Sequence, residues 1–354
     1  MSSYIEVIKI ALLTFPFLAF FISFPFILIN YHKYGSISSM KVIIIYTFIL
    51  YLLCAYFLII LPLPKYEFVA MLKSPRTQLI PFNFIKDFIR ESPFRFTNVH
   101  TYVKAIKHST FYVPLYNIFL TVPFGMYLRY FFKYDLKKTI LASFLLSMFF
   151  ELTQLSGLYF IYPRNYRLFD VDDLILNTFG GICGYIIFRP FNNILPKREE
   201  IDSKALEKGK NVSSFRKSTA FIFDLVLCGI FSTIIYLITR NSGYSFIVSI
   251  IIYYFIVPLF MSGQTLADKY LNIKVVDYNN NYNVFRTMYR RLLFIIIYLV
   301  MPIVLVKYLD VFLSLICFII TLIYTFISIF KYIFTKKVLA FEYISKTKFI
   351  STIK

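Results

Sequence analysis

Long apolar runs fill most of this chain and restrict it to one kind of fold. A helix needs about 20 mostly apolar residues to cross the hydrocarbon core of a bilayer, and the sequence contains nine runs that meet this need. They lie at about residues 5–29, 40–61, 111–132, 139–161, 172–188, 218–239, 245–262, 292–308 and 311–331. A helix satisfies its own backbone hydrogen bonds inside lipid. We therefore predict an all-α polytopic membrane protein with about nine transmembrane helices.

Composition and charge agree with this class. Hydrophobic residues make up 59% of the 354 residues and charged residues 16%. The formal net charge is +20, and the basic residues lie mostly between the apolar runs. We expect membrane lipids with anionic head groups as partners, and no nucleic acid. The sequence shows no nucleotide-binding loop, no serine elbow and no metal-ligand spacing, so we predict no cofactor and no metal site.

The distribution of Lys and Arg predicts the orientation. With the N-terminus outside, the inner segments hold 25 basic residues and the outer segments hold 13, eight of them in residues 62–110. Because basic residues accumulate on the cytoplasmic side, we predict an outside N-terminus and a cytoplasmic C-terminus. Residues 62–110 mix apolar clusters with charges and prolines. They are expected at the membrane surface, either as a simple amphipathic loop on lipid or as a cover for a polar site.

A charged stretch divides the chain into two predicted domains. Residues 191–211 are rich in Lys and Glu and are read as a cytoplasmic linker. Residues 1–190 then form a membrane domain of five helices, and residues 212–354 form one of four helices.

Polar residues crowd the boundary between the fourth and fifth apolar runs. Glu151 and Gln154 lie three residues apart on one helical face, and Asp170, Asp173 and Asn177 share another. Polar groups at membrane depth often mark a functional site. The candidate cluster comprises Asn117, Glu151, Gln154, Arg164, Arg167, Asp170, Asp172, Asp173 and Asn177.

Structural roles are an open alternative for many of these residues. Asp170 or Asp172 can cap the fifth helix, and Asp173 in its first turn favours the helix dipole. Arg164 and Arg167 can balance the charges of the loop. Glu151 can join helices as a protonated or hydrogen-bonded carboxyl, although it is the residue that these roles explain least well.

Four motifs of the first domain form an ordered set. They are QLIPF (78–82), NIFLTVPFG (117–125), ELTQ (151–154) and RLFDVDDLILNTFGGICGY (167–185). In this order they resemble the VanZ-like family over about residues 40–190. The resemblance implies a protein of the bacterial cytoplasmic membrane, similar to an accessory protein associated with teicoplanin resistance. Its motif falls on Asn117, Pro123, Gly125, Glu151, Gln154, Asp170, Asp173, Asn177 and Gly180.

The second domain carries a different resemblance. FRKSTAFIFD (215–224) and GQTLADKYLNIKVVD (263–277) are similar to segments of the RDD family, over about residues 212–350. Arg216 and Asp224 match the first two positions of that family's motif, and Glu342 is the nearest candidate for the third. The resemblance implies a role in ion or proton transport.

Three classes of function follow from these patterns. We favour a non-enzymatic protein that alters the response of the cell envelope to glycopeptide antibiotics such as teicoplanin, with a lipid-linked or glycopeptide ligand at the polar cluster. A second class is a proton- or cation-coupled transporter that uses Glu151 and Asp224. A third is an enzyme acting on a lipid-linked envelope intermediate, with Glu151 and Asp173 as acid and base or Asp172 and Asp173 holding Mg²⁺.

Overall fold

The described part of the chain is helical and contains seven helices long and apolar enough to cross a membrane. The computed structural model describes residues 2–297, 313, 316, 319, 323 and 340–353. The seven candidate spans are Ile5–Tyr34, Ser39–Ile60, Ser109–Tyr130, Leu136–Leu155, Val171–Phe191, Ser214–Thr239 and Ser242–Phe260. They confirm an all-α polytopic membrane protein. The predicted runs at 292–308 and 311–331 fall largely outside the described residues.

The chain separates into two compact units. Unit 1 holds residues 1–22 and 39–201, and unit 2 holds residues 23–38 and 202–354. The predicted boundary at 191–211 stays a prediction, and residues Arg198–Gly209 of that stretch form helix α10.

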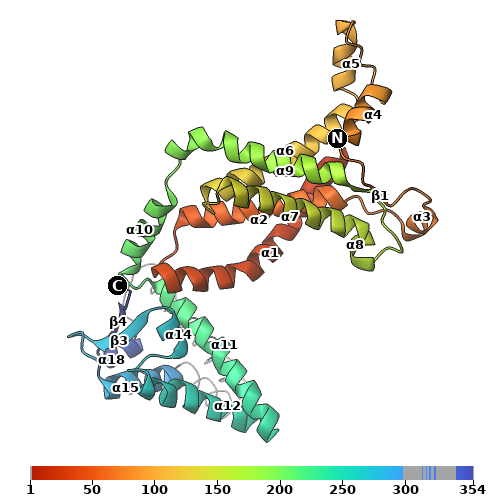
Figure 1. Cartoon of the computed structure of the whole chain (residues 1–354). Helices are drawn as coiled ribbons and strands as arrows, with labels where there is room; N and C mark the ends of the chain where they lie inside the picture. The colour runs from red at the N-terminus through yellow and green to blue at the C-terminus, as the bar shows by residue number, and fades with distance from the viewer. Residues whose placement is uncertain are drawn as a thin grey trace. The chain divides into compact units, whose positions relative to one another are not determined.

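Unit 1 is a helical bundle with short surface elements, shown in Figure 1. Its elements are α1 (Ser2–Tyr34, continuing into unit 2), α2 (Ser39–Ile60), α3 (Tyr66–Met71), β1 (Thr77–Gln78), α4 (Asn83–Glu91), η1 (Val99–Thr101), α5 (Tyr102–Ile106), α6 (Ser109–Tyr130), α7 (Leu136–Leu155), α8 (Gly157–Phe160), β2 (Phe169–Asp170), α9 (Val171–Ile187) and η2 (Arg189–Asn193). Helix α9 packs against both α6 and α7.

Small residues let α6 and α9 approach closely. A Cβ atom added at Gly184 would collide with the backbone carbonyl of Val122, and one added at Gly125 would collide with that of Gly181. Gly180 faces the carbonyl of Ile118 in the same way. The GxxxG spacing of α9 therefore brings two backbones together, as small residues do in many membrane bundles.

The fourth span is shorter than the apolar run that predicts it. Helix α7 ends at Leu155, where the run continues to about residue 161. The Ser156 hydroxyl accepts from the Tyr159 backbone N–H, and Gly157 has a φ of +63°. The helix ends at this turn although the side chains that follow are apolar. The hydropathy of the sequence does not show which residues adopt a left-handed backbone, so it places the end of the span too late.

A segment between α2 and α6 extends away from the bundle. We call residues 83–106, from α4 to α5, the arm (Figure 1). Its base packs on α6, where the Phe88 ring centroid lies 5.9 Å from that of Phe111. Just before it, β1 pairs in parallel with β2, with Gln78 opposite Asp170. This pairing brings the start of the arm to the start of α9.

Unit 2 combines membrane helices with a small antiparallel sheet. Its further elements are α10 (Arg198–Gly209), whose first four residues belong to unit 1, α11 (Ser214–Thr239), α12 (Ser242–Ile251), the π-helix η3 (Ile252–Ile256), α13 (Val257–Phe260), α14 (Leu266–Tyr270), β3 (Ile273–Asp277), α15 (Val284–Ile295), α18 (Ala340–Ile344) and β4 (Thr347–Ser351). Strands β3 and β4 pair from Ile273 opposite Ser351 to Asp277 opposite Thr347.

Arg216 fastens the segments of unit 2 together. Its side chain is fully buried. The guanidinium donates to the carbonyls of Leu271 and Asn272 at 2.8 and 2.7 Å, and to those of Gly35 and Gly209 at 3.1 and 2.8 Å. Four backbone acceptors from three separate stretches of chain thus converge on one planar cation, a geometry that arginine suits well.

Candidate functional site

The predicted polar cluster gathers where α7 ends and α9 begins. Glu151 lies in the last turns of α7 and is 2% exposed. Its Oε2 accepts the backbone N–H of Asp170 at 2.9 Å. This hydrogen bond joins the face of α7 that carries Glu151 directly to strand β2, which leads into α9.

Asp170 is a capping residue. Its Oδ1 accepts the backbone N–H of Asp172 at 2.8 Å and the side-chain amide of Gln78 at 3.2 Å. Burial raises the pKa of the Asp170 carboxyl, and the nearby Asp172 carboxylate raises it further, while these two hydrogen bonds act in the opposite direction. The structure supports the capping role considered from the sequence.

Asp172 holds the start of the arm. It is 3% exposed, and its two carboxylate oxygens accept the backbone N–H groups of Phe82 at 2.5 Å and Phe84 at 2.9 Å. Phe82, at the N-cap of α4, has a left-handed φ of 61°. Both oxygens of Asp172 are thus engaged in fixing the first turn of α4.

Asp173 and Asn177 link α9 to its two neighbours. The Asn117 side chain on α6 donates to the Asp173 carboxylate. On the other side, the Asn177 amide donates to the Ser147 hydroxyl at 3.0 Å, and Ser147 donates to the Asp173 carbonyl at 3.2 Å. The Asn177 Oδ1 atom is buried and has no hydrogen-bond partner among the described residues.

The predicted cationic residues do not neutralise this cluster by contact. Arg164 donates to the carbonyls of Leu72 and Ser74, and Arg167 donates to that of Leu61 at 2.8 Å. Gln154 also turns to a backbone carbonyl, 3.4 Å away. Within the described ranges, no Lys or Arg nitrogen lies within 4.0 Å of the carboxylates of Glu151, Asp170, Asp172 or Asp173.

The cluster is therefore a concentration of hydrogen-bond acceptors at the edge of an apolar bundle. Asp170 and Asp172 serve the local structure, whereas Glu151 and Asp173 each accept a single hydrogen bond from a described residue. Carboxylates of this kind favour a ligand that carries N–H, O–H or cationic groups. In the described part of the chain, no group of three His, Cys, Asp or Glu side chains is placed to hold a metal ion.

Comparison with known families covers this part of the chain. Residues 48–196 match the VanZ/LLP1 family model. The matched range contains the whole polar cluster and helices α6, α7 and α9, and we call it the VanZ-like region. Comparisons with curated proteins and with solved structures find no match. The resemblance of residues 212–350 to the RDD family stays a prediction.

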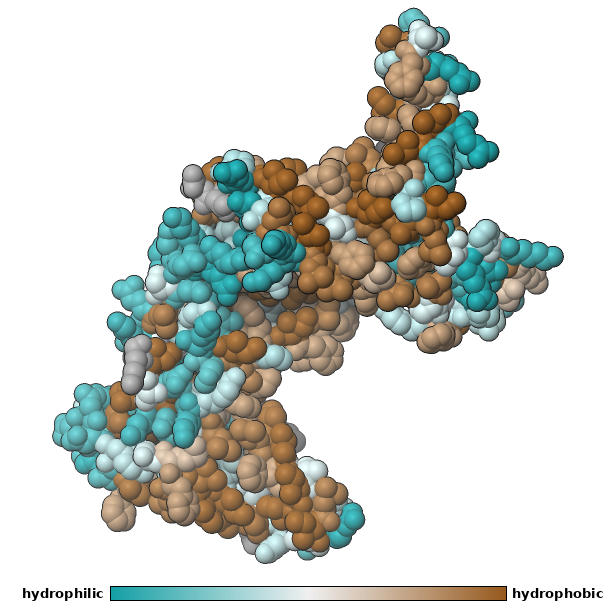
Figure 2. Space-filling view, viewed as in Figure 1, coloured by the Kyte–Doolittle hydropathy of each residue, from teal (hydrophilic) through white to brown (hydrophobic). Residues whose placement is uncertain are grey.

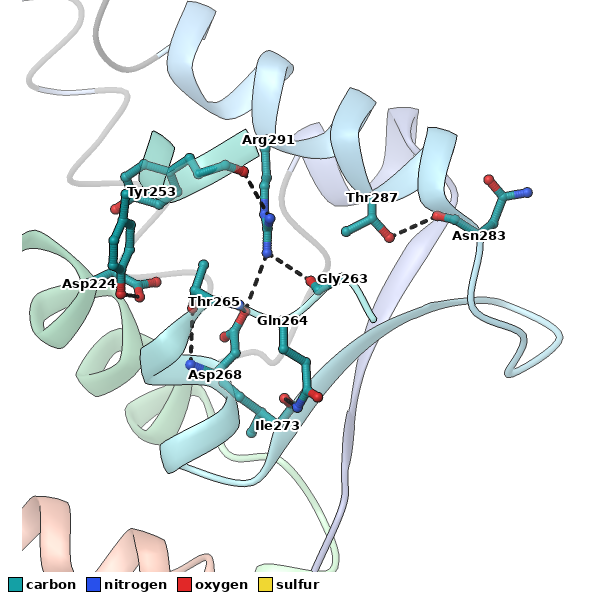
Figure 3. A network of polar contacts seen from close by, with 11 residues as sticks. Asp224, Tyr253, Gly263, Gln264, Thr265, Asp268, Ile273, Asn283, Thr287 and Arg291 are labelled. Atoms are coloured by element: carbon teal, nitrogen blue, oxygen red, sulfur yellow. Dashed lines mark hydrogen bonds and ion pairs between the residues drawn. The ribbon is translucent and has the colours of Figure 1, made fainter. Parts of the chain in front are cut away.

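Outside the VanZ-like region, unit 2 contains a second buried polar network, shown in Figure 3. The Tyr253 hydroxyl from the π-helix η3 donates to Asp224 at 2.6 Å. Arg291 lies 3.7 Å from Asp268 and donates to the carbonyl of Gly263 at 2.8 Å. Burial raises the pKa of Asp268, while Arg291 acts in the opposite direction.

This network joins Asp224 to residues that were not predicted as site residues. Asp268, Tyr253 and Arg291 lie with Asp224 in Figure 3. Glu342, the candidate third RDD position, instead pairs with Arg290 at 2.8 Å. The sequence could have indicated a structural role for Asp268, because Thr265 and Asp268 have the spacing of a capping box, and they form one in the structure. Nothing local indicates that Tyr253 from another helix meets Asp224.

Replacing Asp170 with asparagine is expected to change how stability depends on pH. The raised pKa of Asp170 means that ionising it costs more in the folded state than its usual value of 3.8 implies. The carboxylate therefore destabilises the fold above its folded pKa, and this effect vanishes below 3.8, where both states are protonated. D170N keeps a capping oxygen, so its melting temperature should exceed that of the natural protein at neutral pH and the difference should shrink in acid.

The measurement is the melting temperature of both proteins in nanodiscs at about pH 3, where linkage predicts a small difference, and at about pH 8, where it predicts the full difference. Asp135→Asn is the matched control, because Asp135 is an exposed N-cap on α7. A difference between D170N and the natural protein that is the same at both pH values would contradict the assignment.

Proposed function

We propose that this VanZ-like membrane protein lowers the susceptibility of the cell envelope to glycopeptide antibiotics such as teicoplanin. The observation that supports it most is the set of carboxyl groups at the end of α7 and the start of α9, inside the region that matches the VanZ/LLP1 model. Among the described residues, no Lys or Arg nitrogen lies within 4.0 Å of them. On the outward orientation predicted from the charge distribution, this cluster faces the side from which such compounds arrive.

The chemistry of the cluster suits a ligand of this class. A glycopeptide carries many amide N–H and sugar O–H donors, and each such donor bonds more strongly to a carboxylate than to a neutral acceptor. Glu151 and Asp173 are the residues we assign to binding, because each keeps acceptor capacity beyond its single described hydrogen bond. The ligand is proposed to be the compound itself or a lipid-linked envelope intermediate.

Replacing either carboxyl group with an amide is expected to raise susceptibility to teicoplanin. Glu151→Gln and Asp173→Asn preserve size and retain an oxygen for the bonds from Asp170 and Asn117. Loss of one hydrogen bond between the carboxyl group and the ligand should weaken binding roughly tenfold. The minimal inhibitory concentration of cells expressing either variant should fall toward that of a strain from which the gene is deleted.

Glu199→Gln is the control, because Glu199 is an exposed residue of α10 whose described partner is Lys133 at 3.3 Å. Quantifying each variant in the membrane fraction separates lost binding from lost protein. If deletion of the gene leaves teicoplanin susceptibility unchanged, the proposed function is wrong whatever the variants show.

A further inference from the structure

The arm exposes apolar side chains although it lies outside the seven candidate spans. On α4, Ile85 and Ile89 are 45% and 62% exposed, and further along the arm Phe96 and Val103 are 84% and 61% exposed. Large apolar side chains exposed in this number outside the candidate spans indicate a surface that makes contacts. Figure 2 shows hydrophobic and hydrophilic surface side by side over the arm.

The period of α4 separates its side chains into distinct faces. Phe88 turns toward α6, where it contacts Phe111. Ile85 and Ile89, four residues apart, form the neighbouring outward strip, and each is followed by a basic residue, Lys86 or Arg90. Because successive residues in a helix differ by about 100°, the exposed apolar strip is bordered along its length by a basic strip. Helices that lie in the membrane interface have this arrangement.

The charges of the arm point to an anionic partner. It contains four basic residues, Lys86, Arg90, Arg95 and Lys104, against two acidic ones, Asp87 and Glu91. None of the four basic groups lies within 4.0 Å of a carboxylate in the described part of the chain. Their charge is therefore available to an external partner.

The base of the arm is fixed, so its faces have a defined direction. Asp172 accepts the backbone N–H groups of Phe82 and Phe84, and Phe88 packs on α6. A helix held at its first turn cannot rotate freely about its axis. The contacts with the bundle therefore fix the direction in which the exposed side chains of Ile85 and Ile89 point.

We propose that the arm binds the surface of an anionic lipid bilayer. Ile85, Ile89 and Phe96 enter the boundary between head groups and acyl chains, while Lys86 and Arg90 contact lipid phosphates. A segment of mixed apolar and basic character gains affinity from both contributions. This interaction does not depend on the proposed antibiotic function, because it needs only the arm and its anchor.

The test places a fluorophore on the arm of the full-length protein in nanodiscs. A single cysteine at Ile89→Cys, in a chain whose four native cysteines are alanine, is labelled and exposed to iodide in water or to doxyl-labelled lipid. In nanodiscs containing anionic phosphatidylglycerol, the label should be shielded from iodide and quenched by the lipid probe. Glu91→Cys, an exposed position on the side of α4 away from Ile89, is the matched control and should remain accessible to iodide.

Neutralising the basic strip should release the arm. Lys86→Gln with Arg90→Gln is expected to reduce the membrane-bound population roughly 25-fold, since each basic group near an anionic surface contributes about fivefold. Neutral phosphatidylcholine nanodiscs should have a similar effect. Hydrogen exchange of the unlabelled natural protein provides a second readout, with slower exchange in residues 83–106 when phosphatidylglycerol is present.

Two results would overturn the proposal. Equal iodide access at residue 89 in anionic and neutral nanodiscs, with unchanged hydrogen exchange, would show that the arm does not bind lipid. Shielding of residue 89 in cell membranes but not in anionic nanodiscs would identify a protein as the occupant instead.

Discussion

Replacing Gly184 with alanine is expected to disrupt the bundle of the VanZ-like region. A Cβ at this position would collide with the carbonyl of Val122, and the amide of Met126 lies close behind it. Backbone atoms in a helix cannot move aside as a flexible side chain can, so α6 and α9 would have to separate. Overpacking of this kind costs about 1 to 3 kcal/mol, occasionally more. We expect a lower melting temperature and a larger aggregated fraction on size-exclusion chromatography.

Gly229 offers a matched control on α11. A Cβ added there meets no atom of the described residues within 4 Å, and alanine favours a helix by up to about 1 kcal/mol over glycine. Gly229→Ala should therefore leave the melting temperature unchanged or slightly raised. If G184A and G229A behave alike, the close approach of α6 and α9 is not what stabilises this region.

Replacing Arg216 with glutamine is expected to be the most damaging polar substitution in unit 2. The change removes the donor shared by the carbonyls of Gly35, Gly209, Leu271 and Asn272. The carbonyls of Gly209 and Asn272 keep hydrogen bonds from Ser351 and Thr352. Those of Gly35 and Leu271 keep no other donor among the described residues. Each buried acceptor left unsatisfied costs about 1 to 3 kcal/mol, so the two together should cost about 2 to 6 kcal/mol. Lysine should rescue little, because its single ammonium cannot reproduce the planar fork.

Arg286→Gln is the control for lost charge. Arg286 is 44% exposed and lies 3.8 Å from Asp277, and exposed pairs of this kind contribute about 0 to 1 kcal/mol. Thermal unfolding and limited proteolysis in detergent would compare the two. A melting temperature of R216Q close to that of R286Q would contradict the fastening role.

The seven described spans can be predicted from the sequence, because a spanning helix needs a long run of apolar residues and hydropathy measures such runs directly. The sequence also predicts that Glu151 and Asp170 belong to one cluster, since their runs are adjacent and their helical faces can be read from spacing. Hydropathy misplaces the end of the fourth span, because the turn at Gly157 depends on backbone conformation. The roles of Arg164 and Arg167 are also not local, because their acceptors lie about 90 to 106 residues earlier in the chain.

Contacts between distant segments are the part that the sequence does not reveal. Asp172 lies in the first turn of α9, where the sequence suggests a local capping role. Its carboxylate instead accepts the backbone N–H groups of Phe82 and Phe84. Asp224 is recognisable as a polar residue in an apolar run, but its partner Tyr253 comes from a π-helix on another segment. A carboxylate that accepts backbone N–H groups of a distant segment, or a tyrosine that bonds across helices, leaves no periodic signature in the sequence.

The bond between Asp172 and the start of the arm also sets an order for assembly. Phe82 leaves the ribosome 90 residues before Asp172 does, and synthesis proceeds from the N-terminus. The first turn of α4 cannot be held until β2 and α9 have followed α7 into place. Residues 83–106 therefore complete their structure late, although they are made early, and a nascent chain ending before residue 169 carries an arm whose base is not yet tied down.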